Sequence, residues 1–572
     1  MAEVMNPWFD ISVAEMKVKV LILFSAFLIS LGVQAQTTEF ETATEAVKNM
    51  KVGYNLSNTL DAFTTEEWFN PTGWQDYETV WGNPITKPSQ MKMMRKAGFN
   101  AIRIPVTWFP HMDATGKVDE AWMKRVHEVV DYVIDQGMYC ILNSHHDTSH
   151  KDAWLWADKS YYEVQKRYKY LWTQIAQEFK DYDEHLLFAG WNEILERQEL
   201  FGGEPDKDRY NVLNQINQDF VDAVRMVGGN NKSRNLIVAP YYNWCGWGED
   251  TADFIIEALQ ALTVPNDELP GHILFEVHTY FDTSSNKISE VLDGTIESIN
   301  TYLVSKGVPV VIGEWGPSND YDNPAQSDAF ARQFEEKTHS NHIVTFAWNG
   351  PLCYGEYRVL PAFEQPSYIR AMMKGYYGEE YEPQMLLKSD YDEAGQRKLF
   401  VHTVNYDGIW AELNLFSDDV PLKLKNYKAL RVEFAEPVNT EAFVIKVYGD
   451  GETVQEVQGL SSGLTTAINF SDLPITKEVN RITLQHTQEG KAEAKVISAW
   501  LIRHDGTEEY SDLSPFWGCE ITDVTKLAST AINPAISSPR QANAAIFNLA
   551  GQRLSSPQRG INIIGGRKVV VK

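Results

Sequence analysis

Cysteine and positive charge are both scarce in this 572-residue chain. The four cysteines, at positions 140, 245, 353 and 519, have neither the spacing of a zinc motif nor the density of a disulfide framework. Cys140 lies in an apolar run and is expected to be a buried thiol, whereas a Cys245–Cys353 bridge remains an open alternative. Lysine and arginine total 51 against 78 acidic residues, a net charge of −27. This balance argues against a nucleic acid or an anionic membrane surface as the partner, because both require a basic footprint.

Long hydrophobic runs are absent except near the N-terminus. Met16-Lys-Val-Lys19 is followed by an apolar core from Val20 to Val33 and by small residues up to Ala35. This order is typical of a secretory signal peptide, so residues 1–35 are predicted to be removed and Met16 to be the true start. The run is too short for a transmembrane helix. We therefore expect a secreted or cell-surface protein without stable membrane insertion.

Short apolar runs alternate with amphipathic segments over residues 40–376. Helical periodicity is seen at Trp122–Asp135, Tyr161–Asp181, Asn211–Met226, Ile288–Ser305 and Ala325–Thr338. Eight strand-then-helix units predict a (β/α)8 TIM barrel of the α/β class. A doubly wound sheet is the alternative, but no Gly-rich phosphate loop follows the first strand. The predicted strands are Lys51–Leu56, Ala101–Pro105, Met138–Asn143, Leu186–Gly190, Asn235–Pro240, Ile273–Val277, Pro309–Gly313 and Ile343–Trp348.

The pattern changes after a linker around residues 376–383. Residues 384–524 show period-two alternation broken by Gly, Asp, Asn and Pro, which predicts an all-β sandwich. This domain is a candidate carbohydrate-binding module. Its residues Trp410, Tyr427, Trp500 and Trp517 would form a sugar-binding face in that case, and ordinary core packing is the alternative. Residues 525–572 are predicted to be a linker and a short sorting-like tail.

Two of the predicted barrel strands end in a glutamate. Leu186–Gly190 leads into Trp191-Asn192-Glu193, and Pro309–Gly313 leads into Glu314. Burying carboxylates beside apolar strands is costly unless they are used. Two carboxylates on one barrel rim are what cleavage of a glycosidic bond requires, one to protonate the leaving oxygen and one to attack or to activate water. The alternative is that Glu193 and Glu314 are structural residues, each in an ion pair.

Polar and aromatic residues also follow the other strands, whereas the strand starts show no such enrichment. This asymmetry predicts one site at the carboxyl-terminal rim of the barrel. The remaining rim residues are Asn55, Asn58, Arg103, Trp108, His145, His146, Asn192, Tyr241, Tyr242, Trp244, His278, Tyr280, Trp315, Trp348 and Asn349.

Several tryptophans and one histidine pair have two interpretations. The segment from Tyr241 to Trp247 is expected to line a cleft. A sugar subsite and ordinary packing are equally compatible with each of Trp68, Trp74, Trp81, Trp154 and Trp156. His145-His146-Asp147 is a weak metal-ligand alternative, because neighbouring strand residues face opposite ways.

The motifs of residues 50–375 resemble glycoside hydrolase family 5, the cellulase family of a large retaining clan. The resemblance rests on eight segments in chain order, each near a predicted strand end. They are Gly53-Tyr-Asn-Leu-Ser-Asn-Thr-Leu-Asp61, Trp81-Gly-Asn-Pro84, Phe99-Asn-Ala-Ile-Arg-Ile-Pro-Val-Thr-Trp108, Ile141-Leu-Asn-Ser-His-His146, Trp191-Asn-Glu193, Glu276-Val-His-Thr-Tyr280, Ile312-Gly-Glu-Trp315 and Phe346-Ala-Trp348.

This resemblance implies roles for the rim residues. Glu193 is the expected acid/base and Glu314 the expected nucleophile, with no cofactor and no metal. Arg103 and Tyr280 are expected to hold Glu314 ionised, and the Asn192 amide to bind the sugar 2-hydroxyl. The expected support and substrate-binding residues are Arg103, His145, His146, Asn192, His278, Tyr280, Trp348, Asn58, Trp244 and Trp315.

The resemblance further implies a secreted, retaining endo-β-1,4-glucanase acting on a β-glucan polysaccharide or oligosaccharide. Cellulose and mixed-linkage glucan are the expected substrates, with xyloglucan a further candidate. Two departures, Asp147 and Gly190-Trp191, keep a β-mannanase or xylanase open as alternatives. A non-catalytic glycan-binding surface protein is the alternative from another class, and the presence of both glutamates argues against it.

Overall fold

The computed structural model describes residues 40–246, 253–318, 323–348, 363, 365–391, 397–449, 454–475 and 478–526, together with four short strands between 546 and 571. The predicted signal peptide, Asn349, Cys353 and Trp247 lie outside the described residues. These residues form two compact units that divide between Gln396 and Arg397. No helix within the described ranges is both long and apolar enough to cross a bilayer.

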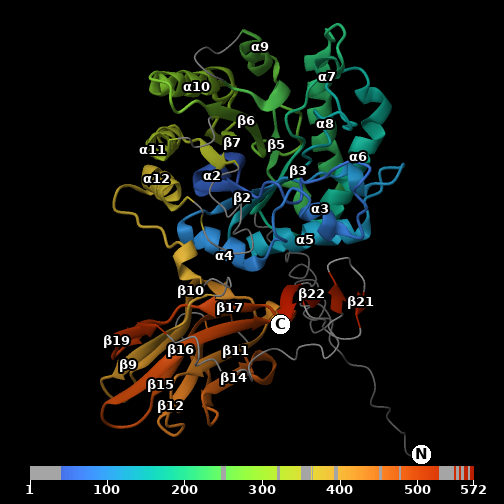
Figure 1. The fold of residues 1–572 in the computed structure, drawn as a ribbon. Coiled ribbons are helices and arrows are strands. Elements are labelled where there is room, and N and C mark those ends of the chain that lie inside the picture. The colour runs from blue at the N-terminus through green and yellow to red at the C-terminus, as the bar shows by residue number, and fades with distance from the viewer. Residues whose placement is uncertain are drawn as a thin grey trace, which may run out of the picture. The chain divides into compact units, whose positions relative to one another are not determined.

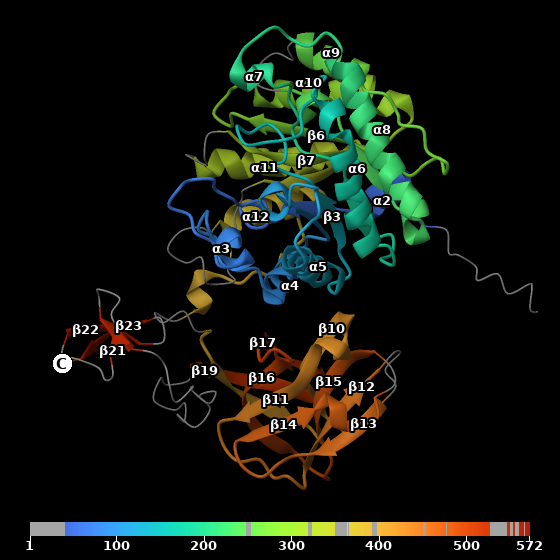
Figure 2. The same cartoon turned by 90° about the vertical axis from the view of Figure 1, so that its right-hand side faces the viewer.

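The first unit is a closed barrel of eight parallel strands, paired in chain order from β1 to β8 and back to β1. Helices surround the strands on the outside (Figures 1 and 2). The predicted TIM barrel is thereby confirmed and the doubly wound sheet is excluded. The strands are β1 (Val52–Asn55), β2 (Ala101–Ile104), β3 (Tyr139–Asn143), β4 (Leu186–Ala189), β5 (Leu236–Val238), β6 (Ile273–Phe281), β7 (Val310–Pro317) and β8 (Val344–Ala347).

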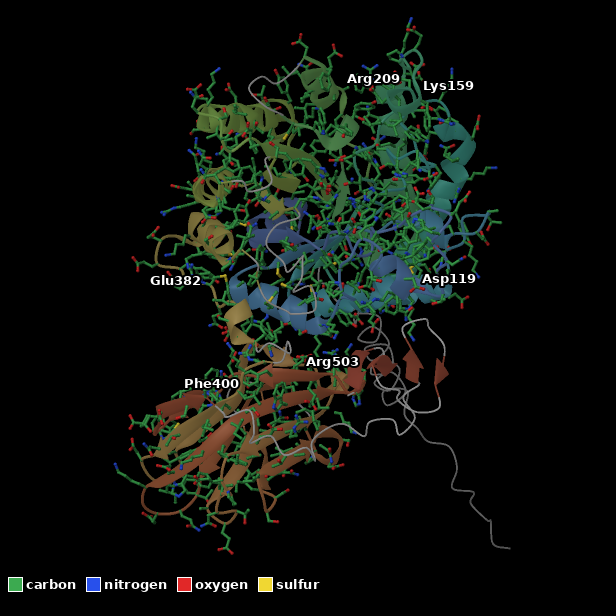
Figure 3. The ribbon with its side chains drawn as sticks, in the orientation of Figure 1. Asp119, Lys159, Arg209, Glu382, Phe400 and Arg503 are labelled. Atoms are coloured by element: carbon green, nitrogen blue, oxygen red, sulfur yellow. The ribbon has the colours of Figure 1, made fainter. Side chains whose placement is uncertain are left out.

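The helices of this unit begin and end at recognisable local signals. The Asp119 carboxylate accepts from the backbone N–H groups of Ala121 and Trp122 at the start of α5 (Figure 3). Asn323 caps α11, which has Pro324 at its first position. The helices are α2 (Ala43–Asn49), α3 (Trp74–Glu78), α4 (Pro88–Ala97), α5 (Glu120–Ile134), α6 (Tyr161–Glu178), α7 (Gln198–Phe201), α8 (Arg209–Val227), α9 (Asp253–Ala261), α10 (Ile288–Tyr302), α11 (Pro324–Ser340) and α12 (Pro366–Tyr377).

The chain after α12 stays on the barrel. Tyr377 donates to the Gly98 carbonyl and stacks on Tyr381, and the Gln384 N–H donates to the Lys96 carbonyl. These contacts explain why the boundary between the units falls later than the predicted linker at 376–383. Composition alone does not reveal which face of a linker packs.

The second unit contains the predicted antiparallel sandwich. A five-stranded sheet has the order β13-β12-β15-β10-β18, and a six-stranded sheet has the order β14-β11-β16-β9-β19. An apolar core lies between them, with Leu413, Val432, Ile445 and Leu484 fully buried. The strands are β9 (Phe400–Tyr406), β10 (Glu412–Leu422), β11 (Tyr427–Phe434), β12 (Phe443–Tyr448), β13 (Val454–Gly459), β14 (Thr465–Asn469), β15 (Val479–His486), β16 (Ala492–Arg503), β17 (Glu508–Ser511), β18 (Ser514–Trp517) and β19 (Cys519–Lys526).

The C-terminal segment contributes a small antiparallel sheet with the strand order β21-β20-β22-β23. The described part of the predicted tail therefore has four strands. They are β20 (Ile546–Asn548), β21 (Arg553–Leu554), β22 (Gly560–Ile564) and β23 (Arg567–Val571).

Candidate active site

The two predicted glutamates meet at the carboxyl-terminal rim of the barrel. Glu193 follows β4, and Glu314 lies in β7, three strands further around. A carboxylate oxygen of each and a ring nitrogen of His278 all lie within 4.8 Å of one another. The Glu193 side chain is 26% exposed, whereas that of Glu314 is 4% exposed. One carboxyl therefore faces solvent and substrate while the other is enclosed.

Arg103, fully buried at the end of β2, ties the site together. One terminal nitrogen donates to Glu314 Oε1 at 2.9 Å and to Asn55 Oδ1 at 2.9 Å. The other donates to Asn192 Oδ1 at 2.8 Å and to Glu276 Oε1 at 2.9 Å. Because the Asn192 oxygen is occupied, its amide NH2 is the group turned to a ligand. A guanidinium suits this task because it presents several donors in a fixed plane.

Glu314 receives a second donor from Tyr280, whose hydroxyl lies 2.9 Å from Oε2. Burial raises the pKa of Glu314 above its ordinary value, and the neighbouring His278, Arg103 and Tyr280 hydroxyl oppose that rise. Both predicted contacts are therefore present, but the expected net lowering of the pKa is wrong. Desolvation of the enclosed carboxyl outweighs the donors.

His278 lies between three carboxyl groups. Its Nδ1 is 2.8 Å from Glu193 Oε1, and its Nε2 is 3.0 Å from Glu276 Oε1. Burial disfavours the imidazolium, but Glu314, Glu193 and Glu276 together raise the pKa of His278 to about 9. The ring is thus a cation at neutral pH and donates from both nitrogens. Two cations, Arg103 and His278, face three carboxyl groups, so the cluster is neutral when one carboxyl holds a proton.

The backbone around the site is shaped for these contacts. Glu193 has a φ of 40°, which is uncommon for a residue with a side chain, and its N–H donates to Asn243 Oδ1 at 3.0 Å. A register shift between β6 and β7 places His278 opposite Glu314. Gly313 lies at that shift, and a Cβ there would come within 2.5 Å of the Glu276 carboxyl carbon. The bulge therefore makes room for Glu276 and turns Glu314 into the barrel.

His145, which follows β3, is held as one neutral tautomer. Asn143 accepts from the Val106 N–H at its Oδ1, so its amide nitrogen donates to His145 Nδ1 at 3.2 Å. Burial keeps the pKa of His145 well below its usual value. The proton consequently sits on Nε2, which leaves His145 a hydrogen-bond donor. The ring stacks on Trp348 with 5.3 Å between centroids.

A cleft of about 610 Å³ opens above the two glutamates. Two pairs of aromatic rings contribute to its lining: His145 with Trp348, and Tyr242 with Trp244, whose rings meet edge-on with 4.3 Å between centroids. Hydroxyl, amide and carboxyl groups complete the lining. Its lining is His145, His146, Thr148, Ser149, His150, Asn192, Glu193, Leu195, Tyr242, Trp244, Tyr280, Glu314, Pro317, Ser318 and Trp348.

Most of the predicted site residues are brought together here, but two lie elsewhere. Trp315 is fully buried and stacks on Phe334 of α11 at 4.0 Å, so it belongs to the packing outside the barrel. Alternation along β7 explains this, because Glu314 points inward and its neighbour must point outward. Asn58 does not line the cleft; its backbone helps to bind the Asp61 carboxylate in the loop after β1.

The tryptophans with two interpretations divide between packing and surface. Trp156 is buried and Trp154 donates to Asp147, so both pack, whereas Trp68 is exposed. Trp81 contacts the ring of the cleft residue His146, with 5.4 Å between centroids. Trp74 lies beneath the Arg125 guanidinium.

The His145-His146-Asp147 metal alternative does not hold. Asp147 turns away and accepts from the Trp108 N–H, the Ser144 hydroxyl and the Trp154 indole. Asp61 instead approaches the two histidines, and burial raises its pKa to about 7. Because Nε2 of His145 carries a proton, it has no lone pair for a metal, so the group Asp61, His145 and His146 also lacks one ligand. Cys245 is a buried free thiol, and its Sγ lies 3.5 Å from the His278 carbonyl oxygen.

Sequence reasoning missed Glu276 and Asn243 as supports of the site, and it placed Asn55 on the rim without giving it a role. Glu276 stands inside the apolar run Ile273–Phe281, the same pattern that singled out Glu193 and Glu314. A search for every ionisable residue in a buried strand would have found it. Asn243 had no comparable signal, because its role depends on the left-handed turn at Tyr242 and Asn243.

Comparison with known proteins agrees with this geometry. Residues 65–350 match the family model described as cellulase, glycosyl hydrolase family 5. The chain belongs to glycosyl hydrolase family 5. In this family-5 barrel both glutamates, Arg103 and His278 come from the segments that carry the resemblance in the sequence.

Individual family-5 relatives cover the barrel and little beyond it. Endoglucanase A of Clostridium longisporum is 38% identical over 328 residues, which are 54% of this chain and 59% of that protein. A broad-specificity endoglucanase structure from an uncultured bacterium is 43% identical, with a TM-score of 0.56, and covers 59% of this chain and 97% of its own. A Prevotella bryantii family-5 enzyme in complex with a xyloglucan tetradecasaccharide is 36% identical, with a TM-score of 0.53, and covers 59% and 99%. The sandwich thus lies outside the region that the family model matches.

Proposed function

We propose that the protein is a retaining endo-β-1,4-glucanase in which Glu314 is the nucleophile and Glu193 the acid/base. The observation that carries the proposal is the closeness of the two carboxylates, since one oxygen of Glu193 lies within 4.8 Å of one oxygen of Glu314. Inverting enzymes hold a water between their carboxyls and need roughly 6.5–9.5 Å, whereas retaining enzymes hold them at about 5 Å. Direct attack by one carboxylate suits the shorter spacing.

In the first step Glu314 attacks the anomeric carbon while Glu193 gives its proton to the leaving oxygen. The glycosidic bond breaks and an ester to Glu314 forms. In the second step Glu193 removes a proton from water, which attacks the same carbon and releases Glu314. The exposure of the two side chains fits these roles, because Glu193 must reach a leaving group and water in turn whereas Glu314 only meets the sugar.

The surrounding residues contribute orientation and charge. Arg103 and Tyr280 donate to different oxygens of Glu314, which fixes its plane before attack. The His278 ring contacts Glu193 Oε1 through its Nδ1, which keeps the Glu193 carboxyl group oriented while that group gives up its proton in the first step and regains one in the second. The free amide of Asn192 is placed for the sugar 2-hydroxyl, a contact that strengthens in the transition state.

The proposed substrates are cellulose and mixed-linkage β-glucan, with xyloglucan as a further one. The names of the relatives support this class, since they are endoglucanases and one is bound to a xyloglucan oligosaccharide. Aromatic rings flanking polar groups suit a neutral sugar chain, which presents flat apolar faces and hydroxyl edges. Export through the signal peptide at residues 16–35 is part of the proposal and is tested by sequencing the N-terminus of secreted protein.

The test is release of reducing ends from cellulose, barley β-glucan, xyloglucan, xylan and mannan, with Glu193→Ala and Glu314→Ala as inactive controls. We expect release from the glucans and its loss in both variants. Activity on mannan or xylan alone would replace the substrate class and leave the mechanism. Near wild-type activity of Glu314→Ala would overturn the mechanism as well.

A further inference from the structure

Two exposed tryptophans stand at one corner of the sandwich. Trp410 is 56% exposed and lies in the turn before β10, and Trp517 is 67% exposed at the end of β18. At Trp410 the chain passes from the six-stranded sheet (β9) to the five-stranded sheet (β10). Just after Trp517 it passes back, from β18 to β19. Both side chains therefore leave the core where the two sheets exchange strands.

The two residues are neighbours in space. Glu412 of β10 is the register partner of Trp517, and Trp410 lies two residues before Glu412. The Asp407 N–H donates to the Gly518 carbonyl at 2.8 Å, and a Cβ on Gly518 would lie 3.3 Å from that of Ala411. Trp410 is the chain neighbour of Ala411 and Trp517 that of Gly518, so the two tryptophans flank this close approach.

The backbone beneath Trp410 is fixed. Its φ of 73° is a left-handed conformation that a bulky side chain rarely adopts. The Trp410 N–H donates to the His486 carbonyl at 2.8 Å, and the His486 N–H donates back to the Ala411 carbonyl at 2.9 Å. This turn exposes the indole to solvent, so its strained backbone does not contribute to the packing of the core. Strained backbone conformations are concentrated at sites that bind ligands.

Trp500 in the same domain shows the contrast. Its indole N–H donates to Ser498 at 2.8 Å, and its ring packs edge-on against Tyr510 at 5.3 Å. Trp500 thus has the partners of a structural residue, whereas the rings of Trp410 and Trp517 are left to solvent.

We propose that Trp410 and Trp517 form a platform on the second unit that binds a β-glucan polysaccharide, as a site distinct from the hydrolytic cleft of the first unit. Indole faces stack on the apolar faces of sugar rings, and Asp407 and Lys491, paired at 3.6 Å and both largely exposed, border the platform with hydroxyl-binding groups. That pair carries no net charge, which suits a neutral glycan, and the chain's charge of −27 disfavours polyanions. Because the platform and the cleft share one chain, binding at the platform raises the concentration of substrate near the cleft.

The test uses the full chain with Glu193→Gln, so that the polymer stays intact. Depletion onto washed microcrystalline cellulose and affinity electrophoresis in barley β-glucan give Kd for this parent and for the same chain with Trp410→Ala and Trp517→Ala. We expect binding about tenfold weaker without the two rings. Trp500→Ala in the same parent is the matched control and should bind as the parent does, with melting temperatures reported for each protein.

Two further readouts separate this site from its alternatives. With Glu193 restored, the double tryptophan variant should cleave a short soluble cello-oligosaccharide at the wild-type rate and insoluble cellulose more slowly. Unchanged Kd in the double variant, or no binding by the parent, would overturn the proposal. A change of oligomeric state in the double variant, measured by light scattering, would also overturn it and assign the rings to self-association. None of these binding outcomes depends on which bond the barrel cleaves.

Discussion

Replacing Tyr280 with phenylalanine isolates one hydrogen bond to the proposed nucleophile. The hydroxyl donates to Glu314 Oε2 at 2.9 Å, and the ring is retained, so the packing of β6 is preserved. Burial already raises the pKa of Glu314, and the Tyr280 hydroxyl is one of the groups that oppose the rise. Without it the pKa moves further upward.

The size of that movement follows from the bond. A hydrogen bond to a charged group contributes about 1.5–3 kcal/mol, and one pKa unit corresponds to about 1.4 kcal/mol. We therefore expect the Glu314 pKa to rise by about one to two units. Because attack requires the carboxylate, the acid limb of the activity profile should shift to higher pH by that amount.

The assay is kcat/KM on soluble barley β-glucan across pH 4–9 for wild type and Tyr280→Phe. Tyr168→Phe is the matched control, since its hydroxyl donates to the Gly190 carbonyl at 3.0 Å and does not reach Glu314. The control should keep the wild-type profile even if it unfolds at a lower temperature. An unshifted acid limb in a folded Tyr280→Phe protein would refute the electrostatic role given to this hydroxyl.

Three further outcomes follow from the site. Glu193→Gln should lose most of its kcat/KM on β-glucan but much less on an aryl cellobioside with an acidic phenol, because kcat/KM reports the first step and a good leaving group needs no proton there; equal losses of kcat/KM on both substrates would contradict the acid role. Glu276→Gln removes a charged acceptor from His278, so the histidine pKa should fall from about 9 by about one unit or more. The charged ring stabilises the fold fully below pH 6.5 and loses this contribution as pH rises through 9, so the variant's melting temperature should begin to decline at lower pH than that of the wild type; parallel curves would contradict this. Gly313→Ala should lower the free energy of unfolding by about 1–3 kcal/mol and reduce activity strongly, because the new Cβ meets Glu276. The control Gly294→Ala, in open space on α10, should be neutral or stabilising by up to about 1 kcal/mol. Similar melting temperatures for the two variants would contradict the packing argument.

The barrel could be predicted from the sequence because each of its strands is a buried apolar run bounded by polar residues. The same pattern located Glu193 and Glu314. It stopped short at β6 and β7, which continue to Phe281 and Pro317. The parts that were missed begin with the polar site residues His278 and Glu314, and a criterion based on apolar runs ends where those residues begin.

The remaining differences arise from geometry that composition does not contain. Trp315 was assigned to the site because it follows Glu314, yet alternation along β7 directs it to Phe334. The net pKa shift of Glu314 depends on how deeply the carboxyl is enclosed, which only the packed barrel defines. Asn243 supports Glu193 through a left-handed turn that no motif indicated.

The central claim is that Glu193 and Glu314 act by double displacement. The measurement that tests it most directly is proton NMR of the sugar anomer first released from barley β-glucan, recorded before mutarotation mixes the two forms. Two displacements at one carbon predict that the β-anomer appears first. Initial release of the α-anomer would contradict the assignment of Glu314 as a nucleophile.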